Sequence, residues 1–174
     1  MIDTFLETHN CFNRLLAEYR EHKKLIVAVD FDDTVFDYHQ KGRTYEQVIN
    51  LLRRCQKHGF WIVLFTACAP DQIESQKAYL KMRGIEVHSV NQNPIDLPFG
   101  NHGKIYFNIL LDDRAGLGQS AEILHQVIDE IEYDGDQPWR KANSSGELPG
   151  DICCLRACGG VCYEHNPFNY RGKS

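Results

Sequence analysis

Four short β-favouring runs alternate with helical patterns between residues 25 and 133, and this alternation strongly constrains the fold. The runs span residues 25–29, 60–65, 85–90 and 105–111. Amphipathic patterns predict helices at about 3–20, 44–57, 71–83 and 117–133. We expect Thr44 and Asp71 to provide the N-terminal caps of the second and third helices. Strands that alternate with helices predict an α/β fold, a three-layer α/β/α sandwich around a parallel sheet with right-handed crossovers.

The last part of the chain has a different composition. Residues 134–174 are rich in Gly, Pro, Asn and Ser and follow neither a helical nor a strand period. A chain of 174 residues suits one domain of ordinary size. We therefore expect a domain at 1–133, with an N-terminal helix at about 3–20 and a core at 25–133. A Cys-rich irregular extension at 134–174 would follow it.

Charge and hydropathy exclude some classes of partner. No apolar run approaches the roughly 20 residues that cross a bilayer, and the N-terminus lacks the pattern of a signal peptide. We therefore expect a cytoplasmic protein with no membrane partner. The net charge of −5 disfavours nucleic acid as a partner, because nucleic-acid binding requires a basic face. The sequence gives no indication of the oligomeric state.

Acidic residues follow two of the predicted strands. Asp30 and Asp32 follow the first strand, where residues two positions apart point to the same side. Asp112 and Asp113 follow the fourth strand. Because parallel strands present their chemistry at their carboxyl ends, at least three carboxylates are expected to meet there. Such a cluster is costly without a cation, and oxygen ligands favour Mg²⁺.

Two further polar residues complete the pattern. Thr66 ends the second strand and places a hydroxyl at the same edge of the sheet. Lys104 precedes the fourth strand and could reach over that edge. Each residue alone is a weak signal, since a single Thr, Lys or acidic pair is usually structural or exposed. The joint pattern is far more specific.

The chain resembles the haloacid dehalogenase (HAD) superfamily of phosphohydrolases. Asp30-Phe31-Asp32-Asp33-Thr34 matches the first motif of that family, an acid–x–acid–x–Thr sequence after an apolar strand. Thr66 matches the second motif, Lys104 the third, and Asp112-Asp113 the fourth, over about residues 25–133. One departure is Asp33, where many members have Gly. The resemblance implies a HAD-like fold and the chemistry of a phosphatase.

The resemblance also implies a catalytic role for each matched residue. Asp30 would be the nucleophile that forms an aspartyl-phosphate, and Asp32 would protonate the leaving oxygen and later activate water. Thr66 would hydrogen-bond the phosphoryl oxygens, and Lys104 would neutralise their charge. Thr34 would shape the loop after the nucleophile.

By the same resemblance, Mg²⁺ would be the cofactor. Asp30, the backbone carbonyl of Asp32 and Asp112 would hold the ion, with Asp113 in support. The ion would let an anionic carboxylate approach an anionic phosphate.

The spacing between motifs leaves no room for the cap domains that many HAD proteins carry, so the chain resembles a capless member with an open site. The expected activity is hydrolysis of a phosphate monoester, with a nucleotide or another small phosphorylated metabolite as the first candidate substrate. A phosphate on nucleic acid or protein is the second. Phosphotransfer to another acceptor and a non-catalytic binding or regulatory module remain open.

Several basic and aromatic residues around the expected site could each serve either of two roles. In the loop after the first motif, four side chains could touch substrate or be ordinary exposed residues: Tyr38, His39, Lys41 and Arg43. Arg114 could bind phosphate or pair with the acidic cluster.

The extension at 134–174 carries a cluster of candidate metal ligands: Cys153, Cys154, Cys158, Cys162 and His165. These residues could hold a structural Zn²⁺, although their spacing is not that of repeated C-x₂-C pairs. The cysteines could instead form a disulfide or remain free or packed thiols, and the extension could also act as a lid.

Overall fold

The structure is a computed structural model of the chain and describes residues 4–95 and 103–136. The described residues up to Glu132 belong to one compact unit. None of the helices in these ranges has both the length and the apolar character that crossing a membrane would require. The Cys-rich cluster from Cys153 to His165 lies outside the described residues, so the zinc site, the lid and the domain boundary stay predictions.

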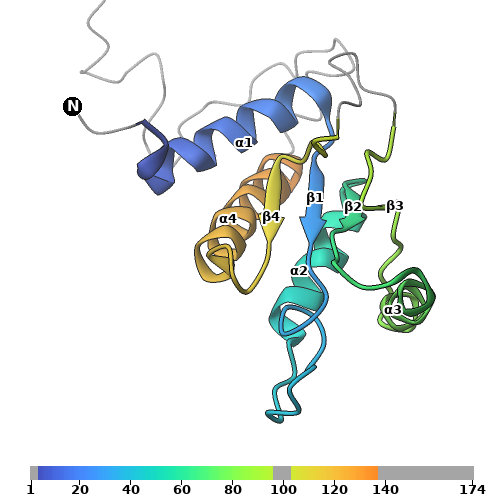
Figure 1. Cartoon of the computed structure of the whole chain (residues 1–174). Coiled ribbons are helices and arrows are strands. Elements are labelled where there is room, and N and C mark those ends of the chain that lie inside the picture. Colours follow the sequence, from blue (N-terminus) through green and yellow to red (C-terminus); the bar gives the residue numbers. More distant parts are fainter. Residues whose placement is uncertain (1–3, 96–102, 137–174) are drawn as a thin grey trace, which may run out of the picture. The chain divides into compact units, whose positions relative to one another are not determined.

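Helices separate the first three strands of a parallel sheet along the chain, and the last helix follows the fourth strand (Figure 1). In chain order the elements are η1 (Thr4–Leu6), α1 (Thr8–His22), β1 (Ile26–Val29), α2 (Glu46–Lys57), β2 (Trp61–Leu64), α3 (Pro70–Met82), β3 (Ser89–Val90), β4 (Ile109–Leu111) and α4 (Leu117–Asp136). The sheet has the order β3-β2-β1-β4, and every pair of neighbours is parallel. The predicted fold class, an α/β fold with a parallel sheet flanked by helices, is confirmed.

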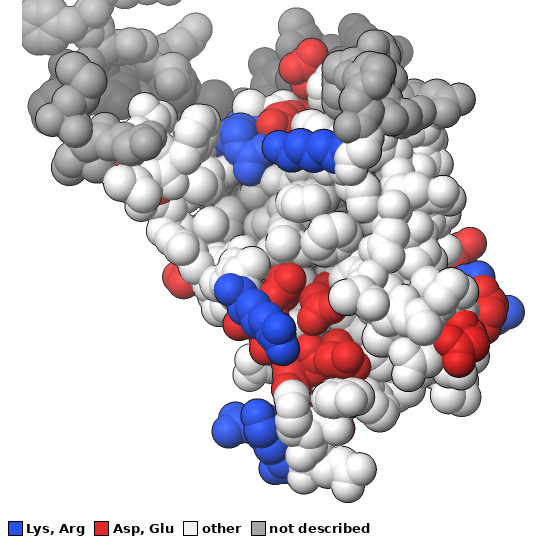
Figure 2. Space-filling model, in the orientation of Figure 1, with Lys and Arg blue, Asp and Glu red and all other residues white. Residues whose placement is uncertain are grey.

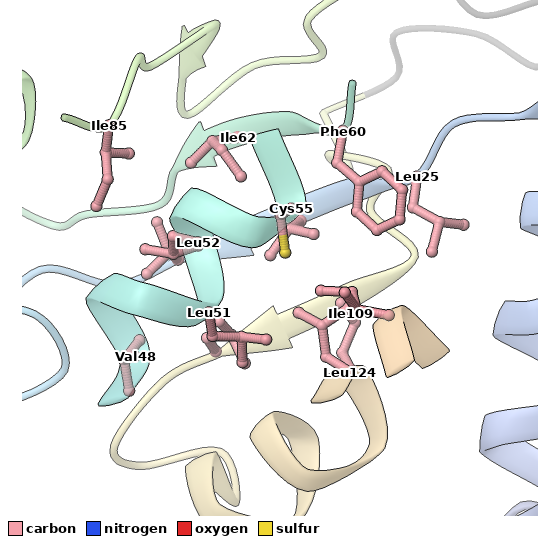
Figure 3. Close-up of a cluster of buried hydrophobic side chains, with 14 of the residues drawn as sticks. Leu25, Val48, Leu51, Leu52, Cys55, Phe60, Ile62, Ile85, Ile109 and Leu124 are labelled. Carbon is pink, nitrogen blue, oxygen red and sulfur yellow. The ribbon is translucent and has the colours of Figure 1, made fainter. Parts of the chain in front are cut away.

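The main hydrophobic core lies against one face of the sheet (Figure 3). Each of the four α-helices contributes to it, for example through Leu15, Leu52, Leu80 and Leu124. A smaller cluster contains the β1 and β2 residues of the other face, Ile26, Ala28 and Val63. In the described ranges, the side chains packed against this smaller cluster come from strands and loops: Trp61, Phe65, Tyr106, Phe107 and Leu110.

Two side chains extend the hydrogen bonding of the sheet at places where the strands are shorter than the β-favouring runs of the sequence. Asn108 precedes β4, and its Oδ1 accepts a hydrogen bond from the backbone N–H of Ile26 over 2.6 Å. His88 precedes β3, and its Nδ1 accepts from the N–H of Ile62 over 3.1 Å. In both cases a side-chain acceptor takes the place of a backbone carbonyl. The predicted strands at 85–90 and 105–111 are therefore shortened to Ser89–Val90 and Ile109–Leu111.

The predicted helix caps are wrong. Helix α2 begins after Tyr45, which adopts a left-handed conformation (φ 52°) and makes no side-chain capping bond. Helix α3 begins at Pro70, a favoured first residue because its missing N–H would have no partner inside the helix. Asp71 then lies in the first turn. Its negative charge interacts favourably with the helix dipole there, but its side chain makes no capping hydrogen bond.

A charged network joins α2 to α4. The guanidinium of Arg54 donates hydrogen bonds to Asp129 over 2.6 Å and to Glu132 over 2.8 Å. The Nε2 atom of His58 lies 3.1 Å from a carboxylate oxygen of Glu132. These contacts hold the pKa of Glu132 down to about 2, with the Arg54 hydrogen bond as the largest cause. The network fixes α4, the helix that follows the β4 carboxylates.

Candidate active site

The ends of two neighbouring strands bring three carboxylates together. Strands β1 and β4 pair in parallel, and the N–H of Asp30 extends the pairing with a hydrogen bond to Leu111 O over 2.9 Å. One carboxylate oxygen each from Asp30, Asp112 and Asp113 lies within 4.8 Å of the others. Figure 2 shows acidic side chains gathered in the lower half of this face, where β1 ends in Figure 1, with basic side chains beside them. The predicted meeting of three carboxylates is found.

The pKa values of two carboxyls reflect this crowding. Burial raises the pKa of Asp30 to about 6, and the charges of Asp112, Asp113 and Asp32 add to the rise. The backbone N–H of Phe31 acts in the opposite direction. Burial and the charge of Asp33 also raise the pKa of Asp32. A cation between the carboxylates would remove the mutual repulsion that contributes to the high pKa of Asp30.

Hydrogen bonds from the backbone fix the loop after β4. The N–H of Arg114 donates to Asp112 Oδ1 over 2.8 Å, so this carboxylate is held by its own loop. The N–H of Asp113 donates to the hydroxyl of Thr34, which is fully buried. The expected role of Thr34, shaping the loop after Asp30, is compatible with this bond. Arg114 itself is exposed beside the carboxylates.

Asp33 organises the loop after β1. Its φ of 53° is left-handed, a conformation that Gly adopts freely and that Asp is one of the few other residues to tolerate. The carboxylate of Asp33 accepts a hydrogen bond from the Tyr45 hydroxyl over 3.0 Å and contacts Nδ1 of His39. Burial acts to raise the pKa of Asp33, but the bonds to His39 and Tyr45 lower it. Asp33 therefore ties both ends of the 38–45 loop to the site.

Thr66 is held at the end of β2 by Asn91, the residue that follows the neighbouring strand β3. Asn91 accepts a hydrogen bond from the N–H of Thr66 over 3.0 Å and donates one to its carbonyl over 2.6 Å. The Thr66 hydroxyl accepts from the N–H of Cys68 over 3.2 Å. That hydroxyl keeps its own proton to donate, which is the bond that an anionic oxygen in the pocket would need.

One cavity of about 590 Å³ unites most of the predicted residues. Its lining includes all of the expected carboxylates and the expected hydroxyl: Asp30, Asp32, Asp112, Asp113 and Thr66. Tyr38 and His39 from the loop after β1 also line it, whereas Lys41 and Arg43 are not part of the lining. Among the described lining residues, Arg114 is the only Lys or Arg.

Lys104 lies in a different cavity. It lines a space with Gly103, Ile105 and residues 91–95, and the described lining of this space contains none of the carboxylates. The reason is its position ahead of β4. Asn108 already pairs with Ile26 at the amino end of β1, so Lys104 comes before the start of the sheet and the carboxylates come after its end. The structure thus brings Asp30, Asp32, Thr66 and Asp112 together but not Lys104.

Sequence reasoning missed two supporting residues. Asn91 follows the edge strand β3 and has the sequence context of an ordinary loop residue, although its left-handed φ of 50° is typical of Asn. Tyr45 falls within the predicted capping sequence, whereas its hydroxyl binds Asp33. Neither role has a sequence signal, because each depends on a contact with a residue from another part of the chain.

The carboxylate group fits a hard divalent cation. Asp30, Asp112 and Asp113 offer only oxygen ligands, and two of them are half-buried. Oxygen-only sets of this kind suit Mg²⁺, which retains water for its remaining positions. The side chain of Asp32 is not part of this three-carboxylate group.

Comparison with known proteins supports the architecture. No family model and no curated protein matches the chain. Among solved structures, the chain is similar to a conserved protein from Bacteroides thetaiotaomicron, with 21% identity and a TM-score of 0.50. The match covers 66% of this chain and 98% of that one. At this identity the similarity shows a shared fold, and it carries no statement about activity.

Proposed function

We propose that the chain is a Mg²⁺-dependent phosphatase that hydrolyses a phosphate monoester through Asp30. The observation that carries this proposal is the convergence of Asp30, Asp112 and Asp113 within 4.8 Å, in a cavity that Asp32 and Thr66 also line. A binding module would not need a nucleophile, a separate proton donor and a cation site in one cavity. The proposal agrees with the HAD resemblance of the sequence.

The first step transfers the phosphoryl group to the protein. A carboxylate oxygen of Asp30 attacks phosphorus, the bond from phosphorus to the ester oxygen breaks, and Asp32 gives its proton to that oxygen. Asp32 suits this task because burial and Asp33 raise its pKa, which favours the protonated form. The hydroxyl of Thr66 donates a hydrogen bond to a phosphoryl oxygen.

The second step restores the protein. Water attacks the phosphorus of the aspartyl-phosphate, Asp32 takes a proton from that water, and Asp30 leaves as a carboxylate. Mg²⁺, when bound by Asp30, Asp112 and Asp113, supplies positive charge that lets two anions approach each other. Arg114 is the only Lys or Arg among the described residues that line this cavity, and we assign to it, rather than to Lys104, the contact with the phosphoryl group.

The test is phosphate release from p-nitrophenyl phosphate, with Mg²⁺ and with EDTA. We expect metal-dependent turnover in the wild type and a loss of at least about 1,000-fold in Asp30→Asn, since the nucleophile is removed. Asp129→Asn, the same change at an exposed position on α4, is the matched control and should keep activity. Full activity in Asp30→Asn would refute the nucleophile, and full activity in EDTA would refute the metal.

A further inference from the structure

We propose that a second cavity beside the carboxylates binds the base of a nucleoside monophosphate, which would make such a nucleotide the substrate. This inference rests on the proposed phosphatase function and identifies its leaving group. The cavity has a volume of about 550 Å³, within the range of small-molecule sites. It is lined by the loop after β1, by Cys68 and by α3, the helix that Figure 1 shows on the side of the sheet away from β4.

The two cavities share a boundary. Asp32, Tyr38, Cys68 and Gln72 line both of them. The proposed ligands of the cation, Asp30, Asp112 and Asp113, line only the first. A substrate whose phosphoryl group lies on those ligands therefore places its ester oxygen near Asp32, the proposed proton donor, and extends its leaving group into the second cavity.

Aromatic rings form a wall of the second cavity. Phe31 and Phe36 stack with ring centroids 5.2 Å apart, and Tyr79 meets both edge-on at 5.5 and 5.2 Å. The Tyr79 hydroxyl donates to Val35 O and accepts from Arg83, so the wall is held in place. Phe36 keeps 36% of its surface exposed. An exposed ring on a fixed support is the surface on which a planar base stacks.

Amide groups supply the polar part of the same cavity. Gln72 lines it from the exposed side of α3, and Gln76 lies below it with only 6% exposure. The Nε2 of Gln76 donates to Cys68 Sγ, while its Oε1 is a buried oxygen without a hydrogen-bond partner among the described residues. Sulfur is a weak acceptor, so rotation of this amide toward a ligand sacrifices little. The aromatic rings can stack on the face of a heterocyclic base, and the amides can hydrogen-bond to its polar edge. A plain phenyl group has no such edge and would use only the rings.

The deciding experiment compares two substrates with the same reacting bond. Adenosine 5′-monophosphate and ribose 5-phosphate both lose phosphate from a primary 5′ oxygen, so a difference in kcat/KM reports the base alone. We expect the wild type to prefer the nucleotide by about tenfold or more, the size of one stacking contact. Phe36→Leu keeps an apolar anchor but removes the ring, and should abolish most of this preference, which is read as the ratio of the two kcat/KM values. Phe5→Leu, the same change on exposed η1, should alter neither rate.

A binding measurement separates this inference from the proposed function. Adenosine carries no phosphate, so an NMR titration with adenosine tests the second cavity whether or not the protein is a phosphatase. We expect shifts of the backbone amides of Ser75 and Gln76 in the wild type and none in Phe36→Leu. Equal turnover of both substrates, or no shift with adenosine, would overturn the base-binding site. Adenosine binding without any phosphate release would instead uphold the site and refute the phosphatase.

Discussion

The backbone N–H of Asp113 donates a hydrogen bond to the side-chain hydroxyl of Thr34 over 3.1 Å. The two residues lie far apart in the sequence, and this bond joins the loop after β1 to the loop after β4. Thr34 itself has no exposed surface. The bond therefore helps to set the separation between Asp30 and the β4 carboxylates.

Thr34→Val should weaken both the fold and the cation site. Valine fills nearly the same volume but removes the acceptor of the Asp113 N–H, and the loss of one such hydrogen bond costs about 0.5–1.5 kcal/mol. We expect a lower free energy of unfolding and a larger Kd for Mg²⁺, measured by urea denaturation and by calorimetry. Thr34→Ser retains the hydroxyl and should keep the Mg²⁺ affinity. Equal affinity in the Val and Ser variants would contradict this role for Thr34.

Asp30→Asn should stabilise the metal-free protein above pH 6. The carboxyl of Asp30 has a pKa of about 6 in the fold against 3.8 in the unfolded chain, so the folded state holds its proton more tightly. Wild-type stability therefore falls as pH rises through 6, and the Asn variant escapes this loss. Since the group is only partly buried, we expect a gain of about 1–2 kcal/mol at pH 7.5 in EDTA and almost none at pH 3.5. Denaturation curves at both pH values measure it, and saturating Mg²⁺ should reverse the order.

Mg²⁺ binding should weaken below pH 6. With an apo pKa of about 6, Asp30 must release a proton before its carboxylate can hold the cation. Titration calorimetry in buffers of different ionisation enthalpy should detect close to one released proton at pH 5 and little release at pH 8. Proton release that does not depend on pH would show that Asp30 is not a ligand.

Asp33→Asn should shift the alkaline limb of the pH–kcat profile to lower pH. The charge of Asp33 helps to raise the pKa of Asp32, and Asn removes that charge while tolerating the same left-handed backbone. Asp32 would then lose its proton at a lower pH and stop acting as an acid sooner. Profiles measured at saturating substrate test this, and a limb that stays in place would mean that another group is the proton donor.

Glu132→Gln should destabilise the protein at neutral pH by about 1 kcal/mol, a modest effect because solvent still reaches part of the Arg54–Glu132 ion pair. The pKa of Glu132 is held at about 2, below the ordinary 4.5, so its stabilising contribution is complete above pH 4.5 and is lost toward pH 2. The difference between variant and wild type should shrink over that range. Glu122→Gln, on the same helix but outside the Arg54 network, is the control.

The sequence carried enough information to predict the order of the elements and the meeting of the acids. Buried runs such as Ile26–Val29 pair in parallel, and the parallel arrangement alone places Asp30 beside Asp112. The same reasoning failed where a side chain does the work of the backbone. His88 and Asn108 precede β3 and β4, and their side chains accept hydrogen bonds from the backbone of the neighbouring strands. The hydrophobic periodicity of the sequence does not predict such bonds.

The placement of Lys104 shows a second limit of sequence reasoning. A match to a motif gives the order of residues along the chain, but it does not show which cavity each residue lines. Asp112 follows β4 and lines the cavity with the other carboxylates, whereas Lys104 precedes β4 and lines a different cavity. Arg114 also follows β4. From the sequence it could bind phosphate or pair with the acidic cluster. The structure separates it from Lys104, because Arg114 lines the carboxylate cavity and Lys104 lines another.

The pair of hydrogen bonds between Asn91 and Thr66 has a consequence for how this scaffold could change. Because the amide clamps the end of β2 before the chain leaves the sheet, the segment after Asn91 could grow without displacing the Thr66 hydroxyl. Insertions after Asn91 would then add new chain next to the Thr66 end of the site while the reactive groups keep their spacing. A position of this kind would let protein engineers, or evolution, exchange the substrate without rebuilding the catalyst.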